Sequence, residues 1–171
     1  MNRALPGSPG CRRRPLYRRA SLTATWVARA FWRRVFSAHY GWRVAAGPQA
    51  SKGELMRYFA ELAWVPHAML YNPQLSWREI DASTVEVSAE SQAGPARVRL
   101  IFENGDITRI EADDRPRMVG RRVVPTRWQG HCCDYREMNG CRIPPRAVVS
   151  WLLEDGPFEY WRGRVTAFRM K

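Results

Sequence analysis

The sequence predicts an α+β domain in which one main helix packs against a curved antiparallel sheet of about seven strands. A single helical pattern is followed by a series of short segments in which apolar and polar residues alternate. Turn residues separate these segments, and two of the turns are Asn-Gly pairs, the strongest short signal for a β-hairpin. Connections this short favour an antiparallel meander over a parallel sheet.

The helix is expected to begin at Ser51, whose hydroxyl can cap it, with Glu54 at the capping-box position. Apolar residues then recur on one face, at Leu55, Phe59 and Leu62. Pro66 should end or kink this helix, and a short second turn is expected over residues 66–71.

The strands are expected at residues 76–81, 84–90, 97–103 and 106–112. Asn104-Gly105 joins the last two of these, and Asn139-Gly140 joins residues 131–138 to 141–144. Two final strands are expected at residues 147–153 and 159–169.

Charge divides the chain into two parts. Residues 1–50 hold ten arginines and no acidic residue, so +10 of the net charge of +12 lies there. The first acidic residue is Glu54, and residues 51–171 carry only +2. A nearly neutral domain at 51–171 therefore follows a basic leader at 1–50, and the total charge is a poor argument for nucleic-acid binding, which we do not expect.

The leader has two interpretations. Residues 1–20 are rich in Pro, Gly and Arg and predict disorder, and residues 21–40 have an imperfect helical pattern. Residues 1–43 could bind a membrane surface through arginine and aromatic side chains. The favoured interpretation is that the leader is a mistranslated stretch, because out-of-frame GC-rich DNA encodes such a composition.

The cellular location of the protein is predicted from the signals that its sequence lacks. No run of 18 apolar residues is present, and arginines interrupt every apolar stretch that a secretory signal would need. Four cysteines, unevenly spaced, do not make a disulfide scaffold. We therefore expect a reducing, cytoplasmic environment.

An ordered series of motifs resembles an uncharacterised bacterial family, a domain of unknown function. The series is RYFAELAWVP, PTRWQG, DYREMNGCRIP and YWRG, and the resemblance covers about residues 44–171. The family has no assigned activity, so the resemblance implies no reaction and no site. It implies that relatives carry a longer, strand-rich N-terminal half, and that this chain is truncated relative to them.

No metal site or cofactor is predicted. If Asn139-Gly140 is a two-residue turn, Met138 pairs with Cys141, and Cys133 pairs with Arg146. Cys133 and Cys141 would then lie about 25 Å apart along the ladder. Zinc ligands must surround one ion at about 2.3 Å, so these cysteines do not share one.

The candidate ligand-binding residues fall into two groups. The first is Glu61 on the helix, which can pair with Arg57 beside it or with Arg115 or Arg162 across the sheet. The second is a set of aromatic residues that either fill the core or line an apolar pocket between helix and sheet. Together the candidates are Arg57, Glu61, Trp64, Arg115, Trp128, Tyr135, Tyr160 and Arg162.

Three functions remain open at this point. The favoured hypothesis is a non-enzymatic domain that binds an apolar small molecule or lipid in the concave sheet, and it predicts that Trp128→Ala weakens binding. The second is an enzyme that uses Glu61 with an arginine partner. The third is a structural remnant of a longer protein.

Overall fold

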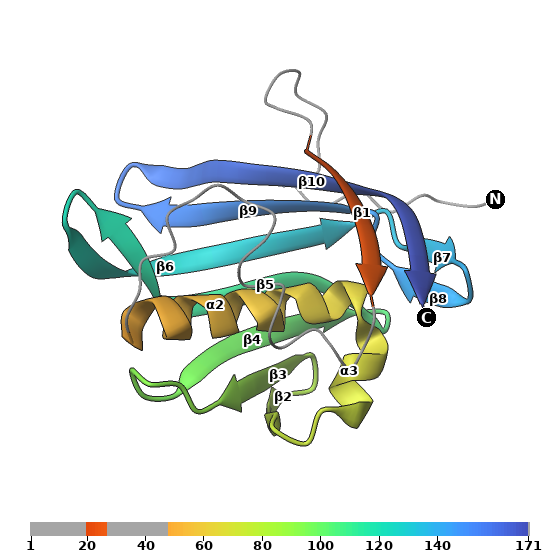
Figure 1. Cartoon of the computed structure of the whole chain (residues 1–171), viewed down its shortest axis with the longest axis horizontal. Coiled ribbons are helices and arrows are strands. Elements are labelled where there is room, and N and C mark those ends of the chain that lie inside the picture. Colours follow the sequence, from red (N-terminus) through yellow and green to blue (C-terminus); the bar gives the residue numbers. More distant parts are fainter. Residues whose placement is uncertain (1–19, 27–47, 171) are drawn as a thin grey trace.

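The computed structural model describes residues 20–26 and 48–170. The expected α+β fold is confirmed: one main helix, α2 (Pro48–Glu61), lies across one face of an antiparallel sheet (Figure 1). A 3₁₀ turn, η2 (Leu62–Trp64), and a short helix, α3 (Pro66–Tyr71), follow it. Pro66 occupies the first turn of α3, where its missing N–H costs nothing.

In the part of the chain that the structure describes, the main sheet contains eight strands in the order β1-β10-β9-β6-β5-β4-β3-β2. Seven of them form the predicted antiparallel meander: β2 (Ser76–Asp81), β3 (Thr84–Ala89), β4 (Ala96–Glu103), β5 (Asp106–Val119), β6 (Arg122–Cys133), β9 (Arg146–Leu153) and β10 (Gly156–Met170). A separate hairpin of β7 (Arg136–Met138) and β8 (Cys141–Ile143) is inserted between β6 and β9.

Several expected boundaries are wrong. The main helix begins at Pro48, so Ser51 lies inside it and is not its cap. Residues 131–138 are not one strand, because Asp134 has a left-handed backbone (φ 62°) that separates β6 from β7. The expected pairs Cys133–Arg146 and Met138–Cys141 are confirmed, although they lie in two different ladders.

The leader holds a strand where a helix was expected. Residues Ala20–Trp26 form β1, which pairs in parallel with β10. The rest of the helix predicted over 21–40 lies outside the described residues, as does most of the predicted membrane-binding segment 1–43. Of residues 1–20, for which disorder was predicted, only Ala20 is described, and it begins β1. The division into a leader and a domain at residue 50 stays a prediction.

The core lies between α2 and the sheet. The helix presents Met56 and Phe59, which are fully buried, and Leu62 of η2 continues the same apolar face. Below it, apolar residues of the antiparallel strands form a row in two paired stretches: Trp77, Val87 and Val98 are cross-strand partners, and so are Ala112, Trp128, Trp151 and Phe158. The row is buried at its centre, while Trp77 and Phe158 at its two ends are exposed.

Close packing explains Gly163 in the YWRG motif. The indole ring of Trp161 lies across it, and a Cβ atom there would collide with that ring. Trp161 in turn makes an edge contact with Trp64, at 6.0 Å between ring centroids. The glycine thus allows η2 to be joined to β10 through two aromatic rings.

Candidate functional site

A groove lies beside α2, between the helix and the edge of the sheet. It has a volume of about 620 Å³, within the usual range for small-molecule pockets. Three segments form it: α2, the connection from α3 to β2, and the β3–β4 turn. Its lining residues in the described part of the chain are Ser51, Glu54, Leu55, Arg57, Tyr58, Glu61, Asn72, Gln74, Leu75, Ser76, Ser88, Ala89, Glu90, Pro95 and Arg97.

Hydrogen bonds hold the walls of this groove in place. The Asn72 side-chain amide donates to the Tyr58 hydroxyl at 3.0 Å, which ties the connection after α3 to the helix. The Asn72 carbonyl oxygen accepts from the backbone N–H of Gln74 at 3.0 Å, a turn stabilised by its own side chain. On the opposite wall, backbone hydrogen bonds between Ser91 and Gly94 close the β3–β4 turn.

Glu61 and Arg57 are the predicted residues that line the groove. Arg57 Nε donates to Glu61 Oε1 at 3.0 Å, across one turn of α2. Burial raises the pKa of the Glu61 carboxyl, and Arg57 opposes this rise only in part. The charge of Arg115, the partner expected across the sheet, also lowers the pKa of Glu61, but by less than Arg57 does. A desolvated carboxylate paired with an arginine at a groove is the kind of group that functional sites contain, although structural ion pairs share the property.

A second group of predicted residues meets on the helix side of the sheet, away from the groove. The Tyr160 hydroxyl accepts from Arg115 Nη1 and from Trp128 Nε1, both at 2.8 Å. The Arg115 guanidinium lies over the Trp128 ring at 4.9 Å and over the Trp151 ring at 5.3 Å. Tyr160 stacks on Trp151 at 5.4 Å.

Trp128 is 3% exposed in this cluster, so it is a core residue. Its burial favours packing, one of the two roles that the sequence left open for the aromatic residues. Trp128→Ala is expected to destabilise the fold and does not report on the groove.

The other three predicted residues lie elsewhere and support the fold. Trp64 Nε1 donates to the Pro144 carbonyl at 2.7 Å. The Tyr135 hydroxyl donates to the Ile107 carbonyl at 2.9 Å, and burial raises its pKa. Arg162 pairs with Glu159, and among the described residues no ion pair joins it to Glu61.

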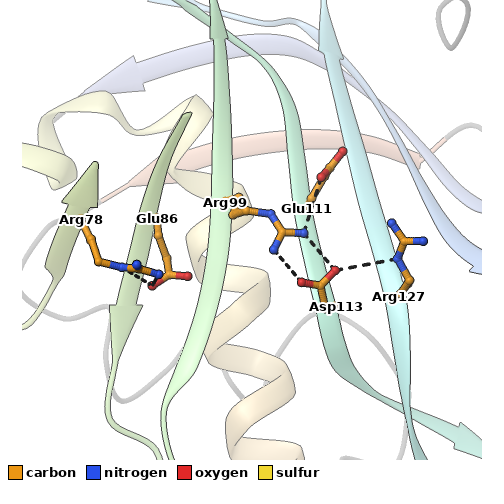
Figure 2. Close-up of polar contacts among 6 residues, drawn as sticks. All are labelled: Arg78, Glu86, Arg99, Glu111, Asp113 and Arg127. Atoms are coloured by element: carbon orange, nitrogen blue, oxygen red, sulfur yellow. Dashed lines mark hydrogen bonds and ion pairs between the residues drawn. The ribbon is translucent and has the colours of Figure 1, made fainter. Parts of the chain in front are cut away.

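A charged network that was not predicted from the sequence lies on the opposite face of the sheet. Figure 2 shows six side chains on β2 to β6 that alternate in sign across the strands, with α2 behind them. We call these six residues the charged row: Arg78, Glu86, Arg99, Glu111, Asp113 and Arg127.

The charged row is held by direct ion pairs. Arg99 binds Asp113 through two hydrogen bonds, at 2.6 and 2.9 Å, and lies 3.6 Å from Glu111. Arg78 binds Glu86 at 3.0 Å, and Arg127 lies 3.8 Å from Asp113. Hydrogen bonds from Arg99 lower the pKa of Asp113. Each arginine of the row thus has a carboxylate within the same sheet.

Two further features bear on function. Within residues 20–26 and 48–170, no three His, Cys, Asp or Glu side chains lie close enough together to hold a metal ion. Across the same residues, no helix combines the length and the apolar character needed to cross a membrane.

Comparison with known proteins identifies a family, but the function of that family is unknown. A model described as a family of unknown function, DUF6544, matches residues 41–163, which confirms the expected resemblance to a domain of unknown function. No curated protein and no solved structure was found to match the chain. The site must therefore be interpreted from its own geometry.

Proposed function

Because the chain belongs to DUF6544, a family of unknown function, we propose its role from the groove alone: a non-enzymatic domain that binds an apolar or lipid-like small molecule beside α2. The observation that carries the proposal is a groove of about 620 Å³ with apolar and polar parts. Leu55, Leu75, Ala89 and Pro95 supply apolar contacts, and Glu61 with Arg57 supplies a polar end. An amphipathic ligand suits this lining better than a bare hydrocarbon does, because charged side chains take up much of the wall.

The test uses a fluorescent fatty acid as the probe and the full chain. Ala89→Phe adds a ring to the groove wall, while Ala82→Phe adds the same ring at the exposed β2–β3 turn and serves as the matched control. We expect saturable binding at one probe per chain, competed by unlabelled fatty acid, and weakened about tenfold or more by Ala89→Phe only. Binding that never saturates, or that is equal in the two variants, contradicts the proposal and favours the structural-remnant hypothesis.

One observation favours a second candidate, an enzyme that uses Glu61. Its carboxyl has a raised pKa and lies at the groove against Arg57, an arrangement suited to general acid–base chemistry. This candidate predicts that Glu61→Gln folds normally and loses hydrolysis of a chromogenic ester, whereas the binding proposal predicts equal background rates. A cytoplasmic location stays a prediction from the cysteine content, and the disulfide bond of Cys133 does not favour it.

A further inference from the structure

Strands β5 and β6 continue beyond the main sheet as a two-stranded ribbon. The pairing of β5 with β4 ends at Glu111, and the pairing of β6 with β9 begins at Trp128. From Arg115 to Thr126, the two strands pair only with each other among the described residues. We call residues 115–126 the ribbon, and Figure 1 shows it projecting past the neighbouring strands.

The tip of the ribbon exposes apolar side chains. All eight residues from Met118 to Pro125 are exposed. Met118 is 54% exposed, Val119 45%, and Val123 and Val124 are each 41% exposed. Because Met118 and Val123 form one cross-strand pair, and neighbouring residues on a strand point to opposite faces, both faces of the tip are apolar. A projecting element with apolar side chains on both faces is a candidate for contact with a partner.

The ribbon also carries charge of one sign. It contains four arginines and no acidic residue. Arg115 and Arg117 lie over aromatic rings at its base. Arg121 and Arg122 lie at the turn, and no carboxylate among the described residues is within ion-pair distance of either. The charge at the tip is therefore complementary to an anionic partner.

Two prolines in the ribbon narrow the class of partner that it can bind. Pro116 and Pro125 lie opposite each other in the ribbon. Neither has a backbone N–H to donate, and proline on an edge strand discourages the addition of another strand. This argues against a β-strand of a second protein as the occupant.

The base of the ribbon is fixed to the domain. Arg115 is held by the Tyr160 hydroxyl and by the rings of Trp128 and Trp151. The tip is therefore presented in a defined direction, which lowers the entropy lost when it binds a surface.

We infer that the ribbon tip docks on an anionic lipid surface. Met118, Val119, Val123 and Val124 enter the boundary between headgroups and acyl chains, while Arg121 and Arg122 contact lipid phosphates. Nucleic acid would also attract the arginines, but its phosphate backbone offers nothing to four apolar side chains. The inference is independent of the groove, because no ribbon residue lines it.

The experiment is a vesicle flotation assay with the full chain. The vesicles contain phosphatidylcholine alone, or phosphatidylcholine and phosphatidylglycerol in equal parts. One variant removes the tip charges (Arg121→Gln with Arg122→Gln), and another removes apolar surface (Met118→Ser with Val123→Ser). Matched controls change exposed residues elsewhere: Arg136→Gln with Arg164→Gln, and Leu70→Ser with Tyr71→Ser. Thermal melting checks that every variant folds.

We expect binding to the anionic vesicles only, weakened about tenfold or more by each ribbon variant and by added salt, and unchanged in the controls. Equal binding by wild type and both ribbon variants overturns the inference, because another part of the chain would then supply the affinity. Tighter binding to duplex DNA that depends on the arginines and not on Met118 and Val123 also overturns it.

Discussion

The charged row and the ribbon are neighbours on β5 and β6, yet their arginines differ in whether they are paired with carboxylates. In the row, Arg78, Arg99 and Arg127 each lie within ion-pair distance of a carboxylate of the same sheet. In the ribbon, Arg121 and Arg122 have no such partner among the described residues. The arginines of the row therefore serve the fold, whereas those of the ribbon tip remain available to a partner.

The difference has a simple physical origin in strand pairing. Within the row, Arg78 faces Glu86, and Arg99 faces Glu111, so unlike charges meet at each step. At the ribbon turn, two arginines are adjacent in the chain and no described carboxylate neutralises them, so water and dissolved ions screen their repulsion. An anionic surface would replace that screening.

The largest effect is expected where the two regions meet. Trp128 is almost fully buried at the base of the ribbon and supports Arg115. Trp128→Ala should lower the free energy of unfolding by about 3–5 kcal/mol, the usual cost of emptying a buried aromatic site. Chemical denaturation measures it, with Val124→Ala at the exposed tip as the control. A loss in Trp128→Ala no larger than the control would show that the ribbon base is not part of the core.

A smaller effect is expected from breaking the row. Arg99→Ala leaves Glu111 and Asp113 without their shared partner, and should cost about 1 kcal/mol, since paired charges at a partly exposed site contribute little more. Arg121→Ala should change the free energy of unfolding by less than about 0.5 kcal/mol, as for an ordinary surface position. Equal losses in the two variants would remove the distinction between the two regions.

The smallest effects depend on pH and have opposite signs. The pKa of Asp113 is lowered by Arg99, so this pair stabilises the fold above the usual carboxyl pKa and loses that contribution as the pH falls through the lowered value. The difference in stability between wild type and Arg99→Ala should therefore shrink in acid. A difference that is constant with pH would contradict the pairing.

Glu61 should behave in the reverse way. Burial raises its pKa, so its contribution to stability is fullest below the usual carboxyl pKa and is lost as the pH rises through the raised value. Relative to Glu61→Gln, wild type should lose stability as the pH rises through this range. Melting curves of both proteins over a pH series measure the effect, and parallel curves would show that Glu61 is well solvated.

Much of the fold could be predicted from local signals. Asn104-Gly105 and Asn139-Gly140 both form turns with positive φ at each residue, as this pair of residues requires. The second helix at Pro66–Tyr71 follows from the proline that begins it. The ribbon was missed, because Pro116 and Pro125 interrupt the strand pattern and argue against a central strand. In the structure both lie where β5 and β6 pair with no other described strand, so the prolines are tolerated.

The candidate sites were harder to predict, because β-bulges decide which residues meet. A regular ladder from the pair Glu103–Asp106 would place Arg99 opposite Ile110. An irregularity between Ile101 and Phe102 shifts the pairing by one residue, and Arg99 meets Glu111 instead. A similar shift after Ala112 brings Arg115 over Trp128. Composition suggested these residue types, but only the register shows their partners.

The most direct test of the account measures unfolding and vesicle binding together in two full-length variants. We expect Arg99→Ala to be less stable than wild type and to bind anionic vesicles as wild type does. We expect Arg121→Gln with Arg122→Gln to be as stable as wild type and to bind the vesicles about tenfold more weakly or worse. If the row variant loses vesicle binding, or the ribbon variant loses stability instead, the division between arginines that serve the fold and arginines that serve a partner is wrong.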